Sequence, residues 1–388
     1  MIKNIAFRFW ELLRSLPLTI LALGLLMALV FLCTIAQVEM GTYGAVQVYM
    51  RSFLVWWTPS GSRFSIPVFP GGALVGLVLT VNLIGSTAKR LGWNRQKAGL
   101  WIIHAGLILL FAGEFVTGAF QTDKRMSIEE GQTINFLEDY REVELAIIDR
   151  TDPASDEVFA VPASLLAKAT VIPLPGSPIT LNVRRFFANA ELTNRAATDP
   201  APLATMGVGA SVNIIERAPT SSEQELNLTS VLIEPVAGGT SYGVWLVSLA
   251  LGAPQSFIHE GHAYALTMRP QRSYLPYSLT LKKFSHDVYA GTQIPKNFSS
   301  LVRVSNPLRF EERDALIYMN QPLRYDGKAF YQSSFGKGDT LTILQVVENP
   351  GWMLPYVSCV LVTLGLLIHF FLRLRQSRKR RQEVREAE

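Results

Sequence analysis

Four long stretches of apolar residues stand out along the 388-residue chain. The stretches from Leu16 to Val38 and from Phe64 to Ala88 contain no Asp, Glu, Lys or Arg. A third, from Ala98 to Phe120, is interrupted only by Glu114, and a fourth, from Asn349 to Leu372, is free of charge. Each is long enough to cross a hydrocarbon core of ~30 Å at about 1.5 Å per residue. The pattern therefore predicts four transmembrane helices.

Two other interpretations of the apolar stretches are disfavoured. The charge-free run from Pro235 to Ile258 is broken repeatedly by glycine and proline, and its apolar core suits a buried strand better than a span. The first stretch follows Lys3, Arg8 and Arg14 as a signal peptide would, but it exceeds the roughly 7–15 residues of a signal core. We therefore expect it to remain as an anchor.

Residues 121–350 show the shorter period that is typical of β-structure. Segments rich in Val, Ile, Thr, Phe and Tyr recur between turn residues. Asp326-Gly327 joins two aromatic-bearing runs within 321–334, which predicts a hairpin with a type I′ turn. Further strands are expected at 143–149, 179–187, 211–217, 263–269, 277–284 and 340–347. This region is therefore predicted to be a mainly antiparallel β domain, with one or two subdomains.

Composition narrows the class of protein. The chain is 49% hydrophobic and only 17% charged, with a mean hydropathy of +0.22. These values exclude a disordered protein and a collagen, and Cys33 and Cys359 are too few for a disulfide-stapled scaffold. The formal net charge of +5 leaves a nucleic-acid surface, a membrane surface or membrane topology as explanations.

The distribution of charge along the chain decides among these explanations. The segment before the first helix sums to +2, residues 89–97 to +4 and the tail after Leu372 to +4, whereas residues 121–350 sum to −5. In a four-helix topology the three basic segments lie on one side, and the positive-inside rule makes that side cytoplasmic. The positive charge thus reflects membrane topology; membrane lipid is an expected partner, and no nucleic-acid partner is expected.

The predicted fold class is an integral membrane protein with four transmembrane α-helices and a large, mainly antiparallel β extracytoplasmic domain. Residues 1–120 form the three-helix membrane region with a cytoplasmic N-terminus, residues 121–350 the outer domain, and residues 351–388 the fourth helix and a basic cytoplasmic tail. Tryptophans are expected at both interfaces, with Trp10, Trp93 and Trp101 inside and Trp56, Trp57 and Trp352 outside.

His104 is the most informative of the five histidines. It lies roughly 8 Å into the third helix from its cytoplasmic end by helical rise. An ionisable side chain at that depth suggests function, because lipid offers it no hydrogen-bond partner. Neutral imidazole is a standard axial ligand of haem iron, while a hydrogen bond to a neighbouring helix is the alternative. Gly106 and Gly113 allow close approach of either a helix or a flat ligand.

The remaining candidates favour structural roles. His369 is expected to reach the headgroups, and His259, His262 and His286 to lie in surface loops. The first two of these loop histidines lack the i, i+4 spacing of a zinc-protease helix, and Gly261 favours a turn. Cys33 and Cys359 lie in predicted spans and are expected to be buried in apolar packing, and Glu114 to be interfacial. No catalytic residues are identified.

Local strings and the overall layout resemble the ResB family of cytochrome c biogenesis proteins. The string Asn320-Gln321-Pro322-Leu323-Arg324-Tyr325-Asp326-Gly327, followed by Phe330-Tyr331-Gln332-Ser333-Ser334-Phe335, is similar to the family's final hairpin. Leu275-Pro276-Tyr277-Ser278-Leu279, Tyr289-Ala290-Gly291-Thr292 and Pro295-Lys296 resemble its preceding segment. His104 before Gly106 matches the family's transmembrane histidine. The chain departs from the pattern at Ser86-Thr87, where a Cys-Thr pair is expected in many relatives.

The resemblance implies a subunit of the bacterial inner membrane, its large domain on the extracytoplasmic side, that handles haem. With a CcsA/ResC-type membrane partner it would move haem b outward and present it to apocytochrome c, while thioredoxin-like proteins that reduce thiols act indirectly. His104 would be an axial ligand of the iron, and the subunit would be non-catalytic or co-catalytic. Two alternatives remain: a cofactor-free membrane-anchored scaffold, and a metalloprotease using His259, Glu260 and His262.

Overall fold

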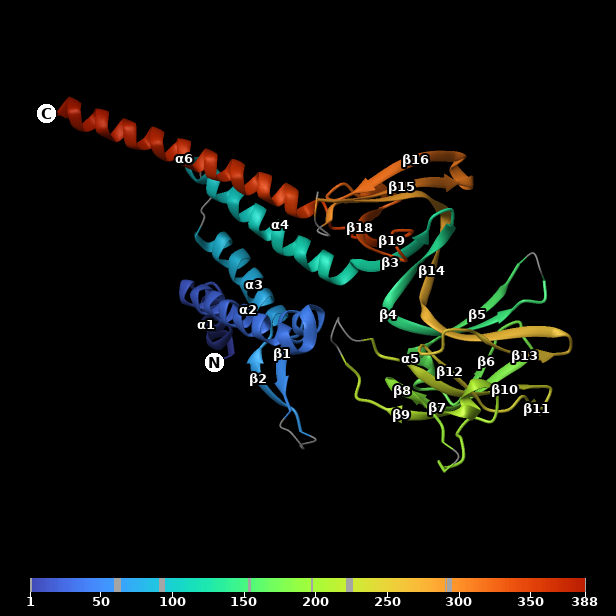
Figure 1. The fold of residues 1–388 in the computed structure, drawn as a ribbon. Helices are drawn as coiled ribbons and strands as arrows, with labels where there is room; N and C mark the ends of the chain where they lie inside the picture. Colours follow the sequence, from blue (N-terminus) through green and yellow to red (C-terminus); the bar gives the residue numbers. More distant parts are fainter. Residues whose placement is uncertain are drawn as a thin grey trace. The chain divides into compact units, whose positions relative to one another are not determined.

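The computed structural model describes residues 2–58, 64–90, 95–152, 155–196, 198–220, 226–289, 291 and 295–387. Trp93, Ala290 and Thr292 lie outside the described residues. The chain divides into two compact units (Figure 1). A helical unit comprises the residues up to Thr122 and those from Glu348, and a β unit comprises the residues between Asp123 and Val347.

The helical unit contains four helices that are long and apolar enough to cross a membrane. They are α2 (Leu16–Ala45), α3 (Gly72–Arg90), α4 (Ala98–Phe120) and α6 (Leu354–Ala387). A π-helix (Val46–Met50) continues α2, and a 3₁₀ turn (Arg95–Lys97) precedes α4. Three such helices thus precede the β unit and one follows it, as predicted.

The first two predicted spans need correction at their ends. A separate helix, α1 (Ile2–Leu13), precedes α2, and the side-chain oxygen of Ser15 caps α2 by accepting a hydrogen bond from the Leu18 amide at 3.3 Å. The second helix begins at Gly72 and not at Phe64. The residues from Phe64 to Gly71 include strand β2 (Ile66–Pro70), which pairs with β1 (Leu54–Trp57) in a hairpin. The helix starts after this strand because the two prolines of β2 do not fit a helix interior.

The β unit is built from antiparallel strand pairs, as predicted. Its strands are β3 (Thr122–Glu129), β4 (Thr133–Asp149), β5 (Glu157–Pro162), β6 (Val171–Pro173), β7 (Ile179–Phe187), β8 (Ala190–Asn194), β9 (Val212–Glu216), β10 (Ser230–Ala237), β11 (Thr240–Ser241), β12 (Trp245–Ser248), β13 (Gln255–His259), β14 (His262–Val288), β15 (Pro295–Asn306), β16 (Glu311–Tyr318), β17 (Leu323–Tyr325), β18 (Lys328–Gly336) and β19 (Leu341–Glu348). Short helices are α5 (Ala163–Leu166) and the 3₁₀ turns Gly207–Ser211 and Pro307–Arg309.

Two long strands, β4 and β14, link two hydrophobic cores within this unit. The ten-stranded sheet has the order β16-β15-β14-β4-β3-β19-β18-β17, with β13 and β5 paired at its side, and a five-stranded sheet has β11-β10-β7-β6 with β12 on β10. One core gathers around Leu279, Val302 and Phe330, and the other around Leu145, Leu181 and Ile233. The β unit is therefore one compact body whose two largest hydrophobic cores share these two strands.

Two local predictions are confirmed. Asp326 and Gly327 have φ values of +50° and +76°, and they join β17 to β18, as a type I′ turn requires. Residues between Pro235 and Ile258 form strands β10 to β13 and not a span, because glycine and proline break them into short segments.

Candidate functional site

His104 lines a pocket of about 460 Å³ between three helices of the helical unit. The other lining residues are Leu16, Thr19 and Leu23 of α2, Leu79, Asn82, Leu83 and Ser86 of α3, and Leu107 and Phe111 of α4. Leu107 and Phe111 follow His104 by three and seven residues, so they share its face of α4. The volume lies within the roughly 300–1,000 Å³ of small-molecule sites, and the lining is mostly apolar.

The hydrogen bond of His104 determines which ring nitrogen remains available. Its Nδ1 lies 2.7 Å from the carbonyl oxygen of Leu100, one helical turn earlier. A carbonyl oxygen can only accept, so Nδ1 carries the proton and donates. In a neutral imidazole with its proton on Nδ1, Nε2 carries the lone pair that can bind a metal. The backbone of α4 thus fixes a ring orientation that suits coordination through Nε2.

Polar residues on α3 and α2 complete the pocket. Asn82 is almost fully buried and uses its whole amide, since Nδ2 donates to the carbonyls of Leu13 and Ser15 at 2.7 and 3.0 Å, and Oδ1 accepts from Thr19 Oγ1 at 2.7 Å. It ties α3 to the break before α2. Ser86, at the position where a cysteine is expected in relatives, donates to the Leu83 carbonyl at 3.2 Å.

Three glycines of α4, Gly99, Gly106 and Gly113, face a helix and not the pocket. A Cβ added at Gly106 would lie 2.8 Å from Val362 Cγ2 of α6, and one at Gly113 would lie 2.8 Å from Leu354 Cβ. Gly99 makes the closest approach, since a Cβ there would lie 2.5 Å from the backbone nitrogen of His369. Of the two possibilities that the sequence left open, close approach of a helix is therefore the one observed.

The residues around the pocket fit an apolar ligand that carries a metal needing one nitrogen donor. His104 supplies neutral imidazole, and leucines with Phe111 supply apolar contact. Among the described residues, no group of three or more His, Cys, Asp or Glu side chains could hold a metal ion. A haem iron bound here would take one axial ligand from His104 and its other ligand from elsewhere.

The His-Glu-Gly-His string closes a hairpin, so the metalloprotease geometry is absent there. His259 ends β13 and His262 begins β14, and the two are register partners. Glu260 and Gly261 both have positive φ, as in a two-residue type I′ turn. A zinc-protease helix cannot form across such a turn. His259 is buried, with Nδ1 2.5 Å from the hydroxyl of Tyr242, so its expected place in a surface loop is wrong.

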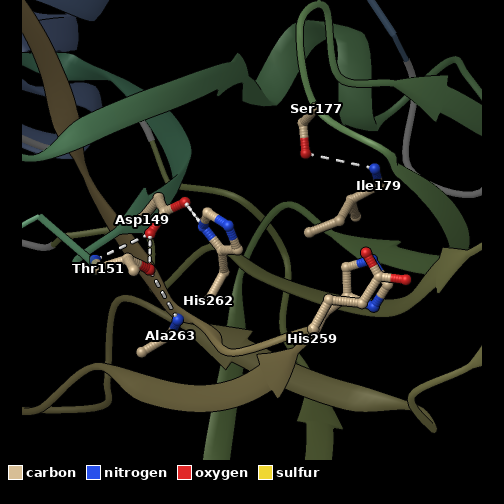
Figure 2. Close-up of polar contacts among 8 residues, drawn as sticks. Asp149, Thr151, Ser177, Ile179, His259, His262 and Ala263 are labelled. Carbon is tan, nitrogen blue, oxygen red and sulfur yellow. Dashed lines mark hydrogen bonds and ion pairs between the residues drawn. The ribbon is translucent and has the colours of Figure 1, made fainter.

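His262 belongs to a carboxylate network of the β unit (Figure 2). Its Nδ1 donates to Asp149 Oδ2 at 2.8 Å, and Thr151 donates to Oδ1 from its amide at 2.9 Å and its hydroxyl at 2.5 Å. Burial raises the pKa of Asp149, but the hydrogen bonds from Thr151 and His262 outweigh it and lower that pKa below its ordinary value. The network fastens the start of β14 to the end of β4.

Replacing Asp149 by alanine tests this network. We expect Asp149→Ala to lower the free energy of unfolding by about 1–3 kcal/mol near pH 7, because Thr151 and His262 lose a buried acceptor. A carboxyl with a lowered folded pKa stabilises fully above its unfolded value of about 4, and the effect disappears as pH falls through the folded pKa. Denaturant unfolding between pH 3 and 7 measures both effects. Asp156→Ala, at an exposed carboxylate, is the control; equal stability of the two variants at pH 7 would contradict the assignment.

Four further expectations can be compared with the structure. His286 lies within strand β14 and not in a loop; its ring stacks on Phe298 with centroids 5.0 Å apart, and this apolar contact holds it in the sheet. Cys33 is buried as expected, but Cys359 is exposed on α6. His369 lies beside Gly99, and its buried Nδ1 has no hydrogen-bond partner among the described residues. Glu114 is exposed in the C-terminal third of α4.

Comparison with known proteins places the match in the β unit. Residues 244–343, from β12 into β19, match the model of the ResB-like family. This segment is therefore similar to the ResB-like family. The match includes the β17–β18 hairpin whose string suggested the resemblance, which is thereby confirmed. His104 lies outside the matched segment.

A curated protein is also similar to part of this chain. The chain is 35% identical over 102 residues to Protein NrfI of Wolinella succinogenes. The aligned stretch is 26% of this chain and 11% of NrfI, so the chain spans only a small part of that relative's length.

Proposed function

We propose that this chain is a membrane subunit for cytochrome c biogenesis that binds haem b through His104 during its transfer to the extracytoplasmic side. One observation supports this most directly: His104 lines an apolar pocket with Nδ1 donating to Leu100 and Nε2 free for iron. The ResB-like match of residues 244–343 supports the biological setting.

Several features of the pocket serve such binding. The Leu100 carbonyl fixes the orientation and tautomer of the imidazole and increases the basicity of Nε2, as partners of metal-bound histidines do. The leucines and Phe111 exclude water from the bound face and contact the apolar macrocycle. Asn82 holds the α2 wall in place through the carbonyls of Leu13 and Ser15. Haem bound here would be cargo, later presented to the cysteines of apocytochrome c.

Because the pocket contributes a single imidazole, a second protein is proposed to supply the other ligand of the haem iron. Six-coordinate haem iron needs two axial ligands, and this pocket supplies one. A multi-span protein of the CcsA/ResC type is the proposed source of the second. The described residues enclose the pocket only in part, which suits a site shared with a partner.

The membrane placement belongs to the same proposal. The four apolar helices would span the bacterial inner membrane, with the basic segments inside and the β unit outside. To check the orientation, Leu308→Cys on the β unit and Arg381→Cys on α6, both exposed, are treated in intact spheroplasts with a membrane-impermeant thiol reagent. We expect labelling of the first only, until the cells are lysed. Labelling of Arg381→Cys in intact cells would contradict the orientation.

Absorption spectroscopy tests haem binding directly. The wild-type chain, purified together with its membrane partner, is expected to show a Soret band and the α and β bands of low-spin haem b, because two axial ligands complete the coordination. A complex that supports cytochrome c maturation yet contains no haem at any stage of purification would contradict the proposal and favour the cofactor-free scaffold.

A further inference from the structure

The short helix α1 (Ile2–Leu13) exposes large apolar side chains although it is too short to cross a membrane. Phe7, Phe9, Trp10 and Leu12 are 63%, 60%, 45% and 57% exposed. Exposed apolar side chains at this density, on one helix of a folded unit, mark a surface that something else covers.

Glu11 lies on the side of α1 that is attached to the protein. It forms ion pairs with Lys89 of α3 and with Arg14, just beyond the end of α1. A Cβ added at Gly85 of α3 would lie 2.7 Å from Arg14 Cγ, so α3 contacts the residue that follows α1. A helix on a water-soluble body packs its large apolar side chains inward and its acidic ones outward. On α1 the aromatic side chains are exposed and Glu11 faces the protein.

The positions of the exposed side chains indicate what covers them. At about 100° per residue, Phe7 and Phe9 point in directions roughly 160° apart around the helix. One flat protein surface cannot cover both, whereas lipid can surround the helix. The first turns of α2 also expose the apolar side chains of Leu16 and Ile20.

The charges near α1 match a phospholipid surface. Exposed Arg8 lies on the helix, and Lys89 and Arg14 lie at its junction with α3. Basic groups beside aromatic and aliphatic side chains are typical of helices that lie at the boundary between headgroups and acyl chains.

We infer that α1 is a membrane-interface helix whose Phe7, Phe9 and Leu12 contact phospholipid at the end of α3 that bears Lys89. The inference rests on the proposed membrane insertion of α2 and α3. Asn82 fastens the residues that join α1 to α2, and Leu16 and Thr19 of α2 line the His104 pocket. The interface helix therefore holds one wall of that pocket at the level of the headgroups.

Spin labelling of the full chain tests the inference. In a background with Cys33→Ser and Cys359→Ser, nitroxide labels are placed singly by Phe7→Cys, Phe9→Cys and Leu12→Cys, and the protein is reconstituted in vesicles of phosphatidylethanolamine and phosphatidylglycerol. Power saturation compares collisions with oxygen, which concentrates in lipid, and with a nickel chelate, which stays in water. Phe31→Cys in the middle of α2 and Arg381→Cys on the tail of α6 are the lipid and water references, and both positions are exposed.

We expect the oxygen-to-nickel ratio at all three α1 positions to exceed that at Arg381→Cys severalfold and to remain below that at Phe31→Cys. A ratio equal to that of Arg381→Cys at Phe7 and Phe9 would place α1 in water and overturn the inference. Labels shielded from both reagents would show a protein partner on α1 and overturn it equally. If Phe31→Cys itself matches the water reference, the proposed insertion fails, and this outcome is distinct from a failure of α1 alone.

Discussion

His104→Ala is expected to lower the haem content of the co-purified complex by at least about 10-fold, because even outer-sphere partners of metal ligands affect affinity by that factor. The substitution removes the one imidazole of the pocket and leaves the Leu100 carbonyl and the apolar lining in place. Covalent cytochrome c formation should fall with it. Soret absorbance per mole of complex, and haem-stained cytochrome c in cells, measure the two effects.

His369→Ala is the matched control, since it removes an imidazole from a helix of the same unit. His369 lies outside the pocket, and its Nδ1 has no partner among the described residues, so its loss leaves no hydrogen-bonding group unsatisfied. Its haem content should equal that of wild type. Added imidazole should restore the spectrum of His104→Ala by entering the space that the side chain vacates. A wild-type spectrum for His104→Ala without imidazole would show that iron binds elsewhere.

The ends of an apolar helix were predictable from sequence where charged or polar residues mark them. Helix α4 begins at Ala98 and ends at Phe120 as predicted, because Lys97 precedes the apolar run and polar residues follow it. The start of α3 was wrong, since a charge-free run does not distinguish a helix from the exposed hairpin of β1 and β2. Helix α1 was missed because its apolar and charged residues alternate within a segment too short to be read as a span.

In the β unit, local patterns predicted strands and turns but did not show which predicted strands belong to one continuous strand. The expected strands 263–269 and 277–284 belong to the single strand β14, which continues through a sequence with prolines at 270 and 276. A proline is a reasonable strand boundary locally, but here irregular pairing with β4 accommodates the interruption. His286 was assigned to a loop on its polarity, whereas stacking on Phe298 holds it in the strand.

The pocket could be predicted only in part. Depth in an apolar helix singled out His104, but Asn82, Thr19 and Ser86 reach it from two other helices, and no single-helix periodicity shows which faces meet. The hydrogen bond to Leu100 follows from i, i−4 spacing and was predictable in principle. Gly99 was not singled out because glycines are common in membrane helices.

The contact between α4 and α6 depends on that glycine, and Gly99→Ala is expected to disrupt it. A Cβ at residue 99 would lie 2.5 Å from the backbone nitrogen of His369 and 2.6 Å from the carbonyl oxygen of Gly365, so backbone must move to make room. Overpacking of this kind costs about 1–3 kcal/mol, and backbone contacts that cannot yield place it toward the upper end. Gly118→Ala, near the C-terminal end of the same helix, is the control because a Cβ there has nothing within 4 Å. Alanine forms helix better than glycine by up to about 1 kcal/mol, so this control should be neutral or slightly stabilising.

Thermal unfolding of the detergent-purified chain, followed by tryptophan fluorescence, should therefore show a lower melting temperature for Gly99→Ala only. Equal melting of the two variants would mean that α4 and α6 do not pack through Gly99.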